Sequence, residues 1–448
     1  MFKTSRMRVS LCVLFLLTIA GTFPLFAGGG KAIKGSVVQI GHWWGAFDTE
    51  TYQPRNDTEE QLLEYRRKIQ ADNGITIREV EVAGWGEMQQ AANSRIMAGN
   101  KEISAFILPP AWAYTLYKQG LLYPLSDSSV KLTNRVPVKG EKTAYNPISE
   151  ELFTFNGKQY AFSPGTGAGS WSGQGVYFNK RLFREARIDP ELPYNMQRDG
   201  TWTWENFLNI CKQLTRDVNN DGIIDIYAGA DNSQLAMFVI SNNAQYVGKN
   251  AQGKFVNTTN TPGFIEAMHF YKRLIDEGVF KMQPEGSAWD WHFADFYQGK
   301  VAIILDAEWR KGMLGDMTDD WGFVFPPKGP RAANYRVGVS ESVYVVPHLF
   351  SPKEVDTILT AIDLWNVPVD DPNAWKTGQY SFYRDRRAVD ETLTMMGDPK
   401  YTTFLNHTMI PGLNTGDFDW NIRGIDDPAQ LIEMNVQYWD SLIDEANE

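Results

Sequence analysis

The stretch that decides the fold is TWTWENFLNICKQLTRDVNNDGIIDIYAGA at residues 201–230, which follows GVYFNKRLFREARID at 175–189. Its first part predicts a helix, because Trp204, Phe207 and Cys211 recur on one apolar face. A loop rich in Asp and Asn comes next, and IIDIYAGA then turns toward a strand. In the earlier segment VYFNK also has the pattern of a strand. The two segments therefore predict alternating strands and helices.

The same alternation appears nearer the N-terminus. The segment SVVQIGHWWGAF at 36–47 predicts a short strand, and TEEQLLEYRRKIQADNG at 58–74 predicts a helix that ends at a glycine cap. ITIREVEV at 75–82 then alternates as a strand does. Further helices are expected at 261–278 and after the capping box that begins at Ser351. This order predicts an α/β fold with mainly parallel sheets flanked by helices.

The first residues have the layout of a secretory signal peptide. Three basic residues precede the apolar run VSLCVLFLLTIAG, and small residues follow, so residues 1–29 are expected to be removed on export. Cys12 lies inside the apolar run and not at the cleavage point, so no lipid-attachment cysteine is evident. The mature chain then keeps only Cys211 and has no internal disulfide. A periplasmic location is expected.

Charge and composition exclude some partners and favour others. The formal net charge is -11, which makes nucleic acid and anionic lipid surfaces poor partners. Beyond the leader no run of about 18 apolar residues occurs, so the mature chain is not expected to insert into a membrane. The chain has 15 Trp and 19 Tyr, which leaves aromatic side chains available for a ligand.

The two segments quoted first resemble the extracellular solute-binding proteins of family 1, the carbohydrate receptors of bacterial ABC importers. Three more segments resemble that family and come in the order that it uses. They are YKQGLLYPLSD at 117–127, DFYQGKVAIILDAEW at 295–309 and VGVSESVYVVP at 337–347. The resemblance covers roughly residues 36–440.

The resemblance implies a two-lobed periplasmic-binding-protein fold with the ligand in the cleft between the lobes. It implies an N-terminal lobe made of residues 36–162 and 326–365, and a C-terminal lobe made of residues 163–325 and 366–448. Hinge closure around a carbohydrate, expected to be an oligosaccharide, would present the closed form to the membrane permease subunits of an ABC importer. The expected protein is a monomeric receptor and not an enzyme.

A sugar offers an apolar face and a rim of hydroxyls, so its site needs flat aromatic side chains and polar groups. Aromatic candidates stand where predicted strands end, which is the usual ligand position in such sheets. These candidates are Trp43, Trp44, Trp85, Trp112 and Trp309. The resemblance places Trp309 where family members stack an aromatic ring on the sugar.

Other candidates lie in loops. Trp171 stands in the glycine-rich loop SPGTGAGSWSGQG at 163–175, and the segment WDWHF supplies two further tryptophans, one of which is expected to face the core. Polar groups and a last aromatic ring come from loops after predicted strands and from the segment near the C-terminus. These further candidates are Asn232, Trp289, Trp291, Glu308, Glu341 and Trp420.

The loop RDVNNDGIID has the oxygen spacing of a calcium-binding loop, but its twelfth position is Ala228 and no second helix follows at once. The resemblance makes a structural calcium ion plausible, whereas the alternative is an Asx-rich turn that needs no metal. No other cofactor is expected. The candidate calcium ligands are Asp217, Asn219, Asp221, the carbonyl of Ile223, and Asp225.

Two alternatives to a carbohydrate receptor stay open at this point. An exported glycoside hydrolase would need two carboxylates about 5 to 9.5 Å apart, and Asp306 and Glu308 lie on one face of a predicted strand. A binding protein for a polyol, a phosphate ester or a peptide is the second alternative. The five histidines show no metal-binding spacing.

Overall fold

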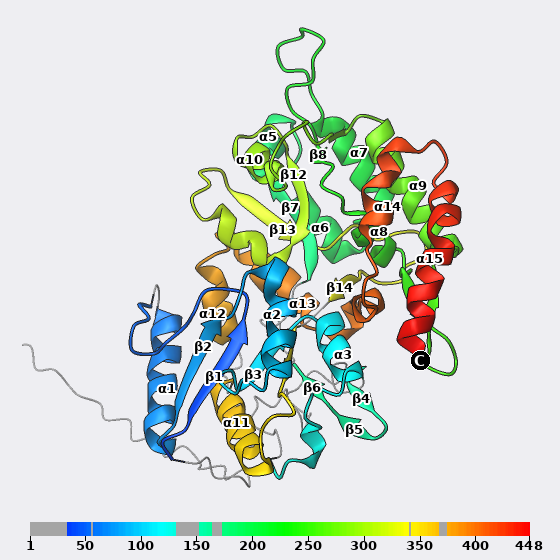
Figure 1. The fold of residues 1–448 in the computed structure, drawn as a ribbon. Helices are drawn as coiled ribbons and strands as arrows, with labels where there is room; N and C mark the ends of the chain where they lie inside the picture. Colours follow the sequence, from blue (N-terminus) through cyan, green and yellow to red (C-terminus); the bar gives the residue numbers. More distant parts are fainter. Residues whose placement is uncertain (1–33, 55–56, 131–151, 164–172, 340–341, 367–373) are drawn as a thin grey trace, which may run out of the picture.

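The computed structural model describes residues 34–54, 57–130, 152–163, 173–339, 342–366 and 374–448. Within them the chain forms two lobes, and Figure 1 shows one above the other. The signal-peptide prediction, Trp171 and Glu341 lie outside the described residues. The exact lobe boundaries stay a prediction.

The lower lobe in Figure 1 is built on a five-stranded sheet in the order β2-β1-β3-β15-β6. Strand β1 runs parallel to both β2 and β3, whereas β15 is antiparallel to β3 and to β6. The late strand β15 thus returns to a sheet made otherwise from the first part of the chain. The strands are β1 (Val37–His42), β2 (Thr76–Glu81), β3 (Ala105–Leu108), β6 (Ala161–Phe162) and β15 (Val343–Val345).

Helices cover this sheet because their apolar faces need burial. The capping box predicted at Ser351 is confirmed, since its side chain accepts from the Glu354 amide and Glu354 accepts from the Ser351 amide. Val38, Ile40 and Leu359 belong to the core between sheet and helix. The helices are α1 (Asp57–Asn73), α2 (Trp85–Met97), α3 (Pro110–Lys118) and α11 (Pro352–Trp365).

The upper lobe is built around β7 (Gln174–Asn179), which lies between β12 (Ile303–Ala307) and β13 (Trp321–Val324). Both neighbours are antiparallel to β7, so the expectation of a mainly parallel sheet is wrong here. Apolar patterns show that a strand is buried but not which way it runs. Gly175 permits close packing, because a Cβ there would lie 2.3 Å from the Phe323 ring.

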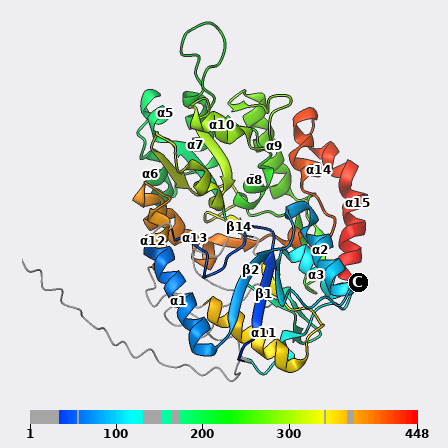
Figure 2. The same ribbon diagram turned by 60° about the vertical axis from the view of Figure 1, so that its left-hand side comes forward.

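Helices of the upper lobe lie around this sheet (Figure 2). The predicted helix with Trp204 and Phe207 on its apolar face is confirmed as α7, and both side chains are buried. Cys211 is buried in the same core, and burial raises the pKa of its thiol, which opposes reactivity. The helices are α5 (Lys180–Glu185), α6 (Leu192–Asp199), α7 (Trp204–Leu214), α8 (Leu235–Ser241), α9 (Pro262–Asp276), α10 (Trp291–Tyr297) and α15 (Ala429–Asn447).

The described residues also contain shorter elements. A parallel pair of strands, β8 and β11, extends the upper lobe, and the hairpin β4-β5 lies beside α3 in Figure 1. They are β4 (Thr154–Phe155), β5 (Lys158–Gln159), β8 (Gly229–Ala230), β9 (Val247–Lys249), β10 (Phe255–Asn257), β11 (Phe280–Lys281), β14 (Val337–Val339), β16 (Thr402–Phe404), α12 (Ala374–Tyr380), α13 (Thr394–Met396), α14 (Gly416–Asp419), η1 (Leu125–Asp127), η2 (Glu308–Leu314), η3 (Ala388–Leu393), η4 (Pro399–Tyr401), η5 (Asn406–Met409) and η6 (Asn421–Gly424).

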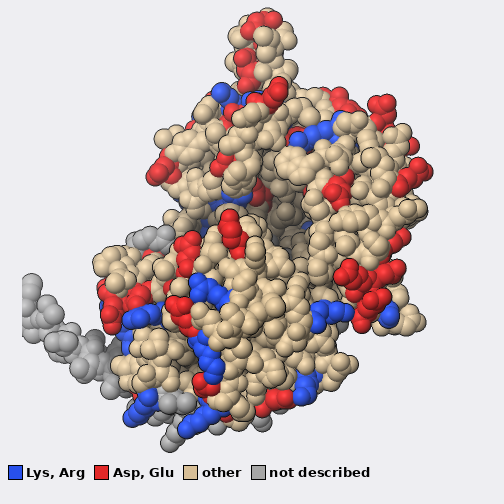
Figure 3. All heavy atoms as spheres, in the orientation of Figure 1, with Lys and Arg blue, Asp and Glu red and all other residues tan. Residues whose placement is uncertain are grey.

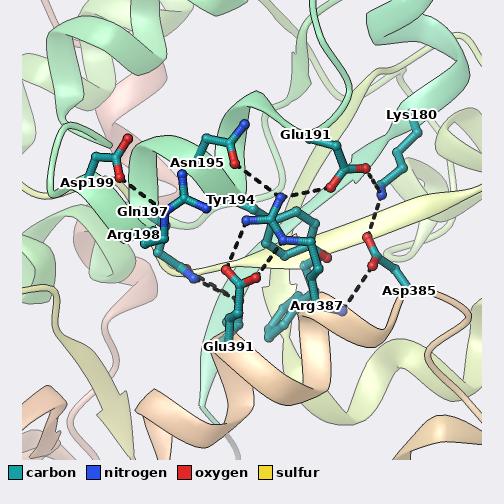
Figure 4. Close-up of polar contacts among 12 residues, drawn as sticks. Lys180, Glu191, Tyr194, Asn195, Gln197, Arg198, Asp199, Asp385, Arg387 and Glu391 are labelled. Carbon is teal, nitrogen blue, oxygen red and sulfur yellow. Dashed lines mark hydrogen bonds and ion pairs between the residues drawn. The ribbon is translucent and has the colours of Figure 1, made fainter.

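An ion-pair network fastens the segment before η3 to the upper lobe (Figure 4). The Arg387 guanidinium donates to Glu391 at 2.6 Å and to Glu191 at 2.9 Å. Lys180 pairs with both Glu191 and Asp385. Burial opposes ionisation of Glu191, but its bonds with Lys180 and Arg387 outweigh burial and lower its pKa. This network holds Asp385, Arg387 and Glu391, which follow Phe382 of the pocket described below.

The two lobes also touch through the C-terminal helix. The hydroxyl of Tyr114 in α3 donates to the carbonyl of Ala446 in α15 at 2.7 Å, and this bond is buried. Figure 1 shows α15 running down the side of the upper lobe until its end lies beside α3. The lobes are therefore joined on this side, away from the hollow between them.

Candidate solute-binding site

Four tryptophans predicted from strand ends are brought together on the lower lobe. Trp43 follows β1, Trp85 opens α2, and Trp112 lies in the first turn of α3. The Trp43 ring lies 5.0 Å from that of Trp85, and the Trp85 and Trp112 rings lie 4.8 Å apart. Trp44 is 40% exposed and Trp85 is 56% exposed, whereas Trp43 and Trp112 are partly buried. The inner pair supports the outer pair, which presents indole faces to solvent.

A histidine not predicted as a site residue orients Trp44. The His42 imidazole stacks on the Trp44 ring at 3.9 Å and 4° between planes, and His42 is fully buried. Its Nε2 atom lies 3.6 Å from Glu79, which also accepts from the Trp365 indole. Burial opposes ionisation of Glu79, but contacts with His42 and Arg66 outweigh it and lower the pKa. His42, which is buried beside Glu79, thus covers one face of the Trp44 ring.

On the upper lobe, Trp309 and Trp289 meet at one arginine. The Arg310 guanidinium lies 4.1 Å from the Trp309 ring centre and 4.2 Å from that of Trp289. Arg310 is nearly buried, yet the two rings are 55% and 63% exposed. Asp306 pairs with Arg310 at 3.6 Å and with His292 at 2.8 Å. Sequence reasoning missed Arg310, since no local pattern places Trp289 beside it.

Two predicted residues point inward instead of into the hollow. Glu308 is 7% exposed, pairs with Lys311 and accepts from the Tyr383 hydroxyl at 3.1 Å. Trp291 is buried at the start of α10, as one member of its pair was expected to be. Both therefore support the site from behind in this conformation.

A third group lies at the end of the upper-lobe sheet. Asn232 donates from Nδ2 to the carbonyl of Leu305 at 2.8 Å. Trp420 is 48% exposed, and the guanidinium of Arg423 lies 4.7 Å from its ring centre. Arg423 was not predicted from the sequence. It connects the two predicted residues, as argued below.

A pocket of about 320 Å³ lies between the lobes. Its wall combines Glu59 of α1 with Trp309 and Lys311 of η2 and with Phe382 after α12. Figure 3 shows that the molecule is hollowed between the two lobes. A larger pocket of about 600 Å³ lies on the lower lobe near Tyr117, away from these tryptophans. The interlobe pocket is the candidate ligand site, because the exposed Trp309 lines it together with Glu59 of the other lobe.

The predicted calcium loop is closed by its own hydrogen bonds. Asp217 accepts from the Asn220 amide at 2.7 Å and from the Gly222 amide at 2.8 Å, and Asp225 accepts from the Val218 amide at 2.7 Å. Within the described part of the chain, no group of three or more His, Cys, Asp or Glu side chains is arranged to hold a metal. The geometry is that of an Asx-rich turn, so the residues as placed do not form a calcium cage. Calcium binding stays a prediction.

Comparison with known proteins defines the class. The family described as bacterial extracellular solute-binding protein matches residues 64–384. Putative binding proteins of Brucella abortus and Brucella suis are 23% identical over 332 residues, which is 72% of this chain and 69% of theirs. The fold and the comparison together define a solute-binding protein. The chain belongs to the bacterial extracellular solute-binding protein family, whose members are non-catalytic components of ABC importers.

Solved structures establish the same two-lobed periplasmic-binding-protein fold. The substrate-binding protein Lmo0181 of Listeria monocytogenes, in complex with cycloalternan, covers 93% of this chain and 98% of its own, at 15% identity and TM-score 0.59. The GacH receptor of Streptomyces glaucescens, solved also with acarbose, covers 92% and 99%, at 12% identity and TM-score 0.60. UgpB of Mycobacterium tuberculosis, in complex with glycerophosphocholine, covers 91% and 98%, at 18% identity and TM-score 0.61.

The family is extracellular, which places the working protein outside the cytoplasm. Among the described residues, no helix is both long enough and apolar enough to cross a membrane.

Proposed function

We propose that this protein binds a neutral carbohydrate, with an oligosaccharide as the expected ligand, between its lobes and delivers it to an ABC importer. The observation that carries the proposal is the exposure of tryptophan faces on both lobes, Trp44 and Trp85 on one and Trp289 and Trp309 on the other. Large exposed aromatic side chains are costly in a soluble protein unless a partner covers them. A sugar ring covers such a face with its C–H groups.

The charges near the site favour a neutral ligand. Arg310 is compensated by Asp306, and Lys311 is compensated by Glu308. A carboxylate or phosphate ligand would need an uncompensated cation or a free bidentate guanidinium edge, because desolvating an anion is expensive. The same pairs weaken the hydrolase alternative, since Asp306 and Glu308 already serve as partners of basic side chains.

The remaining parts of the proposal concern location and assembly. Residues 1–29 would direct export and be removed, which leaves a monomeric receptor in the periplasm. Relatives of this fold solved with cycloalternan, acarbose, D-tagatose and D-mannitol support a sugar or polyol as the solute class. Two lobes joined on one side support closure about a hinge.

A thermal-shift screen of the mature protein tests the proposal. A solute that binds the native state raises the melting temperature. The panel contains cycloalternan, acarbose, D-tagatose, D-mannitol and glycerophosphocholine. A saturable rise with a saccharide, recovered intact afterwards, is the expected result. A rise with glycerophosphocholine alone would overturn the neutral-sugar assignment, and release of a hydrolysis product would overturn the receptor.

A further inference from the structure

Arg423 joins two segments that are far apart in the sequence. Its Nη2 atom donates to the Ser233 hydroxyl at 2.8 Å and to the carbonyl of Asp231 at 3.2 Å, and its Nε atom pairs with the Asp231 carboxylate. The same guanidinium lies 4.7 Å from the centre of the Trp420 ring. One side chain thus holds both the loop after β8 and the indole near the C-terminus.

The loop that Arg423 holds is anchored and strained. Asp231 is fully buried, and it also accepts from the Tyr271 hydroxyl at 2.6 Å. Ser233 has a φ of 62°, which costs free energy for a residue other than glycine. The bonds from Arg423 to both residues stabilise this conformation. The backbone of Asn232, between them, is therefore fixed in place.

Asn232 offers an acceptor that no described residue uses. Its Nδ2 atom is committed to the carbonyl of Leu305, but its Oδ1 atom is buried without a hydrogen-bond partner among the described residues. A buried acceptor left unpaired destabilises the fold, so such an atom needs an explanation. A ligand hydroxyl that donates to Oδ1 would supply one.

We propose that Arg423 is a positioning residue that holds Asn232 and Trp420 together as one saccharide subsite, in which Asn232 accepts from a ring hydroxyl and Trp420 covers the adjoining C–H face. This inference rests on the proposed function and adds to it the residue that connects the two contacts. Arginine suits this role because its planar fork makes several directed bonds while its face stacks on an aromatic ring.

The test uses Arg423→Lys, which keeps a positive charge beside buried Asp231 but loses the fork. Arg331→Lys is the matched control, because Arg331 makes a two-bond pair with Glu266 of α9 on the exposed surface. Binding is measured by calorimetry with whichever panel saccharide shifts the wild type. We expect at least tenfold weaker binding for Arg423→Lys and unchanged binding for the control, with both melting temperatures near wild type.

Two further measurements distinguish a residue that positions the subsite from one that only stabilises the fold. Asn232→Ala combined with Arg423→Lys should bind no more weakly than the weaker single variant, because both act on one subsite. In the ligand-free protein labelled with 5-fluorotryptophan, the Trp420 resonance, assigned with Trp420→Phe, should shift in Arg423→Lys. Wild-type affinity together with an unshifted resonance would overturn the role of Arg423. If no panel saccharide binds the wild type, the proposed function and the saccharide assignment fail, and the fluorine resonance alone decides the positioning role.

Discussion

The guanidinium of Arg310 lies 4.1 Å from the centre of the Trp309 ring, on a side chain that is 9% exposed while the indole is 55% exposed. A nearly buried cation thus holds an exposed aromatic face in place. A face that is already ordered loses less conformational entropy when a ligand covers it. We infer that Arg310 contributes to affinity through Trp309 without needing to touch the ligand.

Replacing Arg310 with lysine should weaken saccharide binding about tenfold, which is about 1.4 kcal/mol. Lysine keeps the charge next to Asp306 but stacks less well against Trp309 and Trp289. Calorimetry on wild type, Arg310→Lys and the surface control Arg273→Lys measures the effect. Equal affinity in all three proteins would show that the stacking is irrelevant to binding.

The two tryptophans of WDWHF should respond in opposite ways. Trp291 is 6% exposed, so Trp291→Ala should destabilise the fold by about 3 to 5 kcal/mol. Trp289 is 63% exposed, so Trp289→Ala should leave stability within about 1 kcal/mol and reduce saccharide affinity. Urea unfolding and calorimetry measure the two quantities. Loss of stability in Trp289→Ala with normal affinity would reverse the assignment.

Asp419 should make stability depend on pH. Burial, with a further contribution from Asp231, raises the pKa of Asp419 to about 7, although the bond from Tyr246 opposes the shift. The native state therefore binds this proton more tightly than the unfolded chain, whose Asp has a pKa of about 3.9. The contribution to stability is full below about pH 4 and is lost as pH rises toward 7.

Asp419→Asn removes that titration and keeps a similar side-chain shape. Urea unfolding between pH 4.5 and 8 should therefore show a flatter pH dependence for Asp419→Asn than for the wild type. Asp417→Asn, two residues earlier, is the control. Parallel profiles for wild type and Asp419→Asn would refute the raised pKa.

The calcium prediction has a direct test at the loop that contains Asp217 and Asp225. If the loop binds calcium, EDTA should lower the melting temperature and calcium should restore it, since a ligand of the native state stabilises it. Asp221→Asn should abolish the response. An unchanged melting temperature would show that the hydrogen bonds within the loop stabilise it without calcium.

The sequence predicted those parts of the fold that depend on residues close together in the chain. The apolar face of α7 and the capping box at Ser351 depend on neighbours within a few residues. The four tryptophans from Trp43 to Trp112 could be grouped, because parallel strands end at one edge. Strand direction in the upper lobe could not be predicted, since an apolar run has no direction.

The site residues that the sequence did not predict are those whose contacts join segments far apart in the chain. Arg310 contacts Trp289, from which 20 residues separate it in the sequence, and Arg423 pairs with Asp231, which lies 192 positions earlier. Glu308 was predicted to contact the ligand, but its carboxylate pairs with Lys311 and accepts from the Tyr383 hydroxyl. Sequence patterns identify which side chains are aromatic or charged, whereas tertiary packing decides which of them remain free for a ligand.

The most direct test of the account is a calorimetric titration of the bound saccharide into wild type, Trp85→Ala and Trp309→Ala, one variant from each lobe. The account predicts one saccharide bound per protein and a loss of about tenfold or more in affinity for each variant, because the ligand is held between the lobes. Normal affinity in either variant would contradict an interlobe site formed by both tryptophans.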